Sequence, residues 1–223
     1  MVESVRDLVP SPDAVLISGD LAEHGAADEY ERVSELAGRL GAPLHVLAGN
    51  HDDRAALRRH FGLPGADAEP VQYAVELGPL RLVVLDSTRP GEERGELDAG
   101  RLAWLEATLA AGPDVPALVA LHHPPVAIGI PAFDAIGLPA ADRRALGDVV
   151  SAHPQIRRIV AGHVHRAVSA ELGGRPVLAA PSTYVQARLD FGAEEFRFSD
   201  DPTGFVVHVW LDGELGSHVQ AVR

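Results

Sequence analysis

The chain has no cysteine, and this absence excludes several kinds of chemistry. Disulfide bonds, thiolate zinc sites and cysteine nucleophiles all require a thiol. Basic residues are also few, because 19 Lys and Arg stand against 32 Asp and Glu, for a net charge of −13. Eleven histidines are present. Imidazole and carboxylate are therefore the strong metal ligands that remain.

The acidic excess argues against two classes of partner. No stretch collects Lys or Arg into a basic face, so we expect no nucleic-acid polymer and no anionic membrane as partner. An anionic substrate would need a local positive charge, which a bound metal ion supplies. Residues 1–7 show no basic flank followed by an apolar stretch, so we expect no secretory signal and a cytoplasmic protein. The most apolar window, residues 115–138, contains prolines, histidines and an aspartate that a lipid-spanning helix would not tolerate.

Short apolar runs alternate with helical patterns over the first three quarters of the chain, which is typical of βα units in a largely parallel sheet. Helices are predicted at 26–40 and 97–109 from the spacing of apolar residues. Strands are predicted at 14–17, 44–47, 80–85, 117–121 and 156–160. After Val164, short alternating segments broken by Gly and Pro predict an antiparallel finish, at 167–172, 176–180, 205–211 and 216–222. The length suffices for one α/β domain.

Four of the predicted strands end in the same way, with small residues followed by metal-ligand types. The carboxyl ends of parallel strands lie on one edge of a sheet, where ligands bind. Each glycine lets the backbone turn sharply, so that the next polar side chain can point into the cleft. The four segments are Ser18-Gly19-Asp20, Gly49-Asn50-His51-Asp52, His122-His123-Pro124 and Gly162-His163-Val164-His165.

These four motifs, in this order, resemble those of the calcineurin-like metallophosphoesterases. Within that family the chain is similar to the bacterial class III cyclic nucleotide phosphodiesterases, on the strength of residues 49–54, 83–87 and 121–125. The resemblance implies an α/β fold, a four-layer α/β/β/α sandwich with metals at the strand ends. It also implies hydrolysis of a small phosphodiester through a metal-bound hydroxide. Cyclic nucleotides of the 3′,5′-cyclic AMP type are the first expectation, and glycerophosphodiesters or other diesters the second.

The resemblance also assigns roles to individual residues. Asp20 matches the carboxylate that bridges two metal ions, and His51 matches the histidine near the leaving group. Asp20 and Asn50 join His51 as the expected catalytic residues. The expected metal ligands are Asp20, Asn50, His122 and His163 for one ion, and Asp20 with His165 for the other. Oxygen and nitrogen ligands of this kind suit Mn, Fe or Zn, in a two-metal arrangement that clamps the phosphoryl oxygens.

One family motif is missing, because no Asp-x-His precedes Gly19. The second metal is then left with Asp20 and His165 alone, so we expect one tight and one weak site. Three explanations stay open. Residues 1–223 form a single metallophosphoesterase domain that is truncated at its N-terminus, lacking its first strand; or the chain is a natural variant with a weak second metal; or it is a catalytically impaired or inactive relative that binds metal or nucleotide. The first is favoured because residues 2–9 resemble the second half of a helix.

Other polar residues near the motifs receive structural interpretations. His123 and Asp86 are expected to support the ligands from behind. Asp52 or Asp53 is expected to cap a helix that runs to Phe61. The arginines of that helix are expected to lie on a solvated face, where the first could approach a phosphate: Arg54, Arg58 and Arg59. Six further histidines are expected in the core or on the surface: His24, His45, His60, His153, His208 and His218.

The apolar loop at 126–139 is a candidate for substrate choice. The side chains of Ile128, Ile130 and Phe133 are expected to be exposed. The loop is therefore expected to wall an apolar pocket for a nucleobase, or to contribute to the contact of a homodimer.

Overall fold

The computed structural model describes residues 1–67 and 69–222. Its helices are α1 (Val2–Arg6), α2 (Ala27–Ala37), α3 (Arg54–Phe61), α4 (Ala99–Ala110), α5 (Pro131–Ala135) and α6 (Ala140–Ala152). Its strands are β1 (Val15–Ile17), β2 (Leu44–Val46), β3 (Tyr73–Leu77), β4 (Leu80–Val84), β5 (Ala117–Ala120), β6 (Ile156–Ala161), β7 (Val168–Leu172), β8 (Arg175–Ala179), β9 (Gln186–Ala187), β10 (Phe198–Ser199), β11 (Gly204–Leu211) and β12 (Glu214–Ala221).

A six-stranded sheet with the order β3-β4-β5-β6-β8-β7 forms the centre of the molecule. Its inner strands β4, β5, β6 and β8 run parallel, and the edge strands β3 and β7 are antiparallel to their neighbours. All four residues of β5 are buried, because a strand inside such a sheet is covered on both faces. The predicted βα pattern is thereby confirmed for this sheet.

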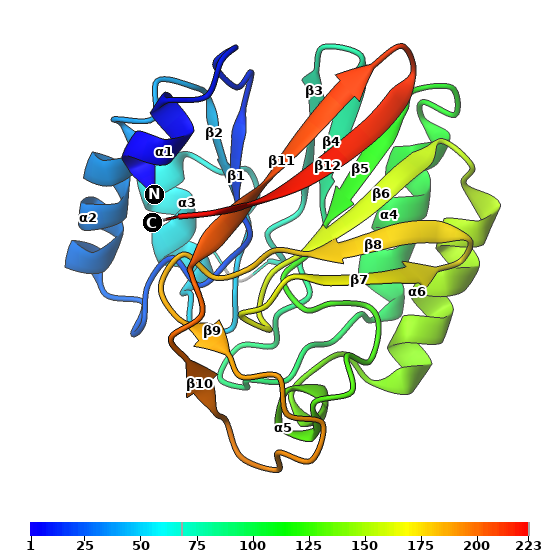
Figure 1. The fold of residues 1–223 in the computed structure, drawn as a ribbon. Coiled ribbons are helices and arrows are strands. Elements are labelled where there is room, and N and C mark those ends of the chain that lie inside the picture. Colours follow the sequence, from blue (N-terminus) through cyan, green and yellow to red (C-terminus); the bar gives the residue numbers. More distant parts are fainter. Residues whose placement is uncertain (68, 223) are drawn as a thin grey trace.

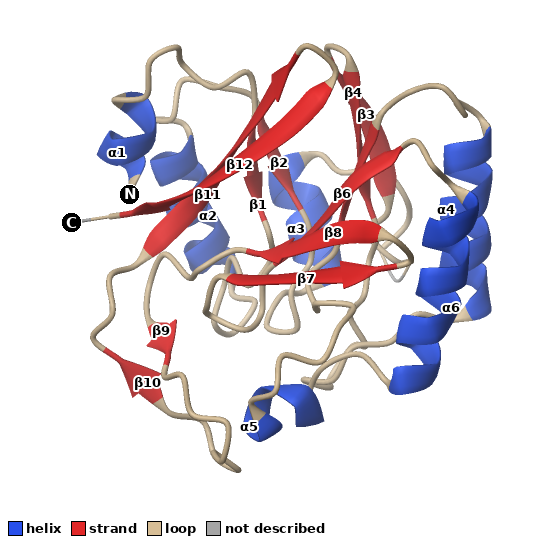
Figure 2. Ribbon diagram, turned by 45° about the vertical axis from the view of Figure 1, so that its right-hand side comes forward, coloured by secondary structure: helices blue, strands red, loops and turns tan. Residues whose placement is uncertain are grey.

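The strands and helices stack in four layers, which confirms the predicted α/β/β/α sandwich (Figure 1). Helices α4 and α6 cover one face of the large sheet, through Leu105 and Leu146. The opposite face packs against the second β layer, which consists of the pairs β1-β2 and β11-β12. Helices α2 and α3 complete the sandwich on the far side of β1 and β2, through Tyr30 and Leu57. Figure 2 shows α4 and α6 on one side of the large sheet and α1 to α3 on the other side of the molecule.

The predicted strands are split between the two β layers. β1 and β2 pair in parallel with each other, in a sheet of their own, while β4, β5 and β6 belong to the large sheet. The expectation that all of their ends lie on one edge of a single sheet is therefore wrong in detail. Because the two sheets pack face to face, the ends of β1, β2, β5 and β6 still meet, and that meeting point carries the four motifs.

Some elements escape the sequence prediction. β3 forms a hairpin with β4, and its residues 73–77 alternate between partly buried and exposed positions. α6 buries Leu146, Val149 and Val150, at a helical spacing that the sequence does display. The antiparallel finish is confirmed for the pairs β7-β8 and β11-β12, although β8 also joins β6 in parallel.

The loop at 126–139 differs from its prediction. Ile130 and Phe133 are only 2% and 5% exposed, so they do not wall an open pocket. They pack with Val164, Ala187 and Ala193 in one apolar cluster. The segment around β9 and β10 covers these side chains. It lies more than fifty positions later in the chain and folds back over the loop.

Among the described residues, no helix combines the length and the apolar character needed to cross a membrane.

Candidate metal centre

The centre begins with an ion pair between the two β layers. His122, at the end of β5, places its Nε2 3.1 Å from Oδ2 of Asp20, at the end of β1. The His122 Nδ1 lies 2.7 Å from the Ser18 carbonyl oxygen. A carbonyl only accepts, so Nδ1–H is the donor and Nε2 faces the centre. This second contact orients the ring, as is usual for a metal-binding imidazole.

Asn50 joins the two histidine motifs. Its Oδ1 lies 3.1 Å from Nε2 of His122 and 3.0 Å from Nδ1 of His163. Asp20, His122 and His163 each offer a ligand atom, and these atoms all lie within 4.8 Å of one another. The structure thus brings together the four side chains predicted for one metal ion.

His165 and His51 stand beside this group rather than inside it. His165 follows His163 on the same turn, but its ligand atoms are not among those that converge within 4.8 Å. The backbone N–H of His51 donates to Asp20 Oδ1 at 3.1 Å, and the His51 side chain is 38% exposed. Its ring Nδ1 lies 3.1 Å from the Glu23 carbonyl oxygen, which leaves Nε2 toward the open face.

The donor set fits a divalent cation. A neutral His122 that donates through Nδ1 presents a lone pair at Nε2, and two oxygen acceptors lie 3.1 Å from that nitrogen. These three acceptors, Nε2 of His122 and the two oxygens, point at one another, and a cation between them would bind all three. In addition, Nε2 of His163 and Nδ1 of His165 are buried without a hydrogen-bond partner in the described part of the chain. Buried imidazole nitrogens without partners are available as ligands.

The electrostatics favour the ligand forms of Asp20, His163 and His165, whereas His122 is held in its protonated form by Asp20. Burial raises the pKa of Asp20, but the charge of His122 and its hydrogen bond outweigh burial, so the pKa lies well below its usual range. For His122, burial lowers the pKa and the Asp20 carboxylate raises it, with a net rise. Burial lowers the pKa of His163 and of His165. A carboxylate and neutral imidazoles are the protonation states that bind a cation.

Strained backbone is concentrated at this centre. Four non-glycine residues of the described chain have a positive φ, and three of them are Asp20 (54°), His163 (67°) and His165 (48°). Such conformations cost about 1–3 kcal/mol each and persist where the surroundings hold them. Glycine is required nearby, since a Cβ on Gly49 would collide with the Asp20 carboxylate.

Asp52 has a role that sequence reasoning missed. It was expected as one of two candidates for the cap of α3, but Asp53 is the cap, since its side chain accepts from the Ala56 N–H at 2.7 Å. Asp52 instead accepts from Gly49 N–H at 2.8 Å and from Leu21 N–H at 3.1 Å. These two backbones belong to the loops after β2 and β1, so one carboxylate ties the two loops together.

A buried ion pair corrects the prediction for the arginines of α3. Arg54 is 9% exposed, and its Nε lies 2.9 Å from Oδ2 of Asp86, at the end of β4. Arg58 is also buried, and it donates to three backbone carbonyls. Both were expected on a solvated face, where only Arg59 lies. The strand that supplies Asp86 is remote in sequence, which is why the helical pattern did not reveal the pair.

His123 supports the centre from behind, as predicted. Ser87 Oγ lies 2.9 Å from its Nδ1 and accepts from its backbone N–H at 3.1 Å. Its ring centroid is 4.4 Å from that of His163. Burial and the charge of His122 lower the pKa of His123 to about 3, so its ring is neutral at pH 7.

Solved structures share this fold. A dimetal phosphatase from Danio rerio aligns over 99% of this chain and 84% of its own, with a TM-score of 0.67 and 15% identity. A purple acid phosphatase from yellow lupin aligns over 98% of this chain and 46% of its own, with a TM-score of 0.72 and 15% identity. At such identities the likeness concerns the fold alone.

The family is defined by sequence. The model of the calcineurin-like phosphoesterase family matches residues 2–167, and the chain belongs to this family. A Pseudomonas aeruginosa protein named a 3′,5′-cyclic adenosine monophosphate phosphodiesterase is 37% identical, over 100% of this chain and 79% of its own. An Arcobacter nitrofigilis protein named a probable glycerophosphodiester phosphodiesterase is 33% identical, over 98% of this chain and 81% of its own.

Proposed function

We propose that this chain is a metal-dependent hydrolase of small phosphodiesters, with 3′,5′-cyclic nucleotides as the first substrate class. The observation that carries the proposal is the convergence of Asp20, Asn50, His122 and His163 at the junction of the two β layers. The similarity to a relative named for cyclic adenosine monophosphate supports the choice of substrate.

The proposed site divides into metal ligands and a proton donor. Asp20, Asn50, His122 and His163 would hold one divalent cation, and Asp20 with His165 would hold a weaker second one. A bound cation of the Mn, Fe or Zn kind supplies Lewis-acid stabilisation of the charge that develops on the phosphoryl oxygens. His51 would donate a proton from its outward-facing Nε2 to the departing oxygen. The Glu23 carbonyl accepts from Nδ1–H, so the form of His51 that could give up a proton at Nε2 is the imidazolium, which carries a proton on both nitrogens.

Glycerophosphodiesters are a second candidate class, favoured by the similarity to the relative named for that activity. The contrasting proposal is a relative that binds metal or nucleotide but hydrolyses slowly or not at all, because the Asp-x-His motif is missing from residues 1–223. The same residues are proposed to form a single domain, and the cytoplasm and a homodimer remain predictions.

The test combines metal content with turnover. Protein loaded with Mn²⁺ is expected to hydrolyse 3′,5′-cyclic AMP and bis(p-nitrophenyl) phosphate. The variant His122→Ala is expected to lose bound metal and at least about 100-fold of the rate, since even outer contacts of a metal site are worth 10- to 100-fold. His218→Ala, on an exposed position of β12, is the matched control. One bound metal without turnover of either diester would favour the binding relative instead.

A further inference from the structure

Exposed apolar side chains gather on one short arm of the molecule. The arm, residues 184–198 with β9 and the first residue of β10, carries five of the nine large apolar side chains that are exposed in the described part of the chain. Their exposed fractions run from 44% to 86%. Clustered exposed apolar groups usually mark a surface that binds something. The five are Tyr184, Leu189, Phe191, Phe196 and Phe198.

One of these rings lies beside the metal centre. The centroid of the Phe198 ring is 6.0 Å from that of the His165 ring, with 44° between the two planes. Half of Phe198 is exposed. The position of Phe198 is fixed by its pairing with Ala187, whose N–H donates to the His165 carbonyl at 2.8 Å. Arg166 donates to the Ala187 carbonyl, also at 2.8 Å.

The inner side of the arm is anchored as well. The Phe196 ring packs edge-on against Phe133, with 5.1 Å between centroids. The Ala132 N–H donates to the Ala193 carbonyl at 3.0 Å. Because the arm is bound both to α5 and to the turn that carries His165, Phe198 is held in place next to the metal centre.

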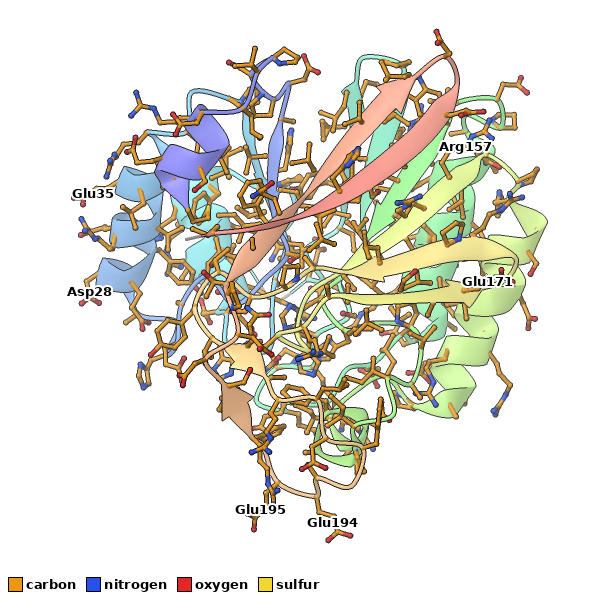
Figure 3. All side chains as sticks on the ribbon, in the orientation of Figure 1. Asp28, Glu35, Arg157, Glu171, Glu194 and Glu195 are labelled. Carbon is orange, nitrogen blue, oxygen red and sulfur yellow. The ribbon has the colours of Figure 1, made fainter. Side chains whose placement is uncertain are left out.

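The charges of the arm suit the uncharged part of a substrate. The arm has three acidic side chains and two arginines, and Arg197 pairs with Asp190 at 3.1 Å. Glu194 and Glu195 project from its tip, away from the body of the molecule (Figure 3). The cation proposed at the Asp20 group would attract the phosphate, and the exposed rings of the arm suit an apolar portion of the substrate.

We infer that Phe198 is a specificity-determining residue that packs against a flat aromatic group of the substrate, the nucleobase of a nucleotide phosphodiester. This inference rests on the proposed function and selects between its two substrate classes. Aromatic rings attract one another at centroid separations of 4.5–7 Å, and base stacking on a protein ring is typically worth tenfold or more in affinity. A glycerol group has no flat apolar face and gains nothing comparable.

The test compares two substrates and three variants. Phe198→Ala in the Mn²⁺-loaded protein is expected to raise the KM for 3′,5′-cyclic AMP about tenfold, with kcat within twofold. The KM for glycerophosphoethanolamine should stay within twofold. Phe198→Tyr keeps the ring and should restore the KM for cyclic AMP. Phe191→Ala is the control, since Phe191 is exposed on the same arm but packs near Gly129.

A binding measurement separates this inference from the proposed function. Calorimetry should show that Phe198→Ala weakens AMP binding about tenfold and leaves inorganic phosphate unchanged. If the wild-type protein turns over no diester but the Phe198→Ala variant binds AMP more weakly than the wild type, the hydrolase is refuted and the subsite is retained. Equal losses for AMP and phosphate, or an unchanged AMP affinity, would overturn the subsite. A wild-type dimer that Phe198→Ala converts to a monomer would overturn it too, and would assign the arm to contact between two copies.

Discussion

The Asp52 carboxylate accepts a hydrogen bond from the backbone N–H of Gly49 at 2.8 Å, directly before Asn50, one of the proposed metal ligands. The same carboxylate accepts from Leu21 and Ala22, directly after Asp20. One side chain thereby fixes the two loops on which Asp20 and Asn50 depend, including the strained backbone of Asp20.

Replacement of Asp52 should weaken the metal centre without touching a ligand. We expect Asp52→Asn to lower Mn²⁺ affinity by about 10- to 100-fold, because an amide cannot accept all of these bonds through both of its side-chain atoms. Titration calorimetry measures this. Asp53→Ala removes the neighbouring helix cap and should cost about 1 kcal/mol of stability while Mn²⁺ affinity stays the same. Equal effects of both variants on affinity would show that Asp52 acts only through overall stability.

Gly49 tests how closely the second loop must approach Asp20. A methyl group at Gly49 would overlap the Asp20 carboxylate, so Gly49→Ala is expected to reduce Mn²⁺ affinity at least tenfold. Gly147→Ala, inside α6, places its Cβ 3.4 Å from Leu172 and should instead stabilise the fold by about 0.5–1 kcal/mol. Unfolding in urea with and without Mn²⁺ distinguishes the two. An unchanged metal affinity in Gly49→Ala would contradict the close approach.

The Arg54–Asp86 pair is expected to matter for stability. Asp86→Ala takes away the carboxylate that faces a buried guanidinium, and such a loss costs about 3–5 kcal/mol. Arg59→Ala, on the exposed face of the same helix, should change the free energy of unfolding by less than about 0.5 kcal/mol. Chemical denaturation of both variants measures the difference. Similar small losses in both would indicate that water reaches the pair.

His208 should make the stability of the fold dependent on pH. Burial and the charge of Arg158 lower the pKa of His208 to about 4. The unfolded chain, with a histidine pKa near 6.5, therefore binds more protons than the folded chain between these values. The contribution of His208 is complete above pH 6.5 and is lost as the pH falls toward 4.

Urea unfolding at pH 7 and pH 5 tests this. His208→Gln should reduce the loss of stability between the two pH values, whereas His218→Gln, exposed on β12, should leave it as in the wild type. A wild-type loss that persists in full in His208→Gln would assign the pH dependence to other groups.

The features that sequence reasoning predicted are local ones. Asp20, Asn50 and His163 each follow a glycine after a strand, and His122 directly follows an apolar strand. These local motifs, together with the family resemblance of the four in order, are enough to predict the four residues. The partners of Asp52 and Arg54 lie on other loops, and no spacing within one motif reveals them. Ile130 and Phe133 read as exposed because the arm that covers them, around Ala193, comes from a distant part of the chain.

The division of the strands between two sheets has a mechanical consequence. Asp20 and Asn50 are attached to the small sheet, whereas His122 and His163 are attached to the large one. A cation bound by all four would connect the two β layers at a point where no strand pairing of the described residues joins them. Sliding one layer over the other by a single residue would take the ligand set apart, so the affinity of the centre for metal reports the alignment of the whole sandwich.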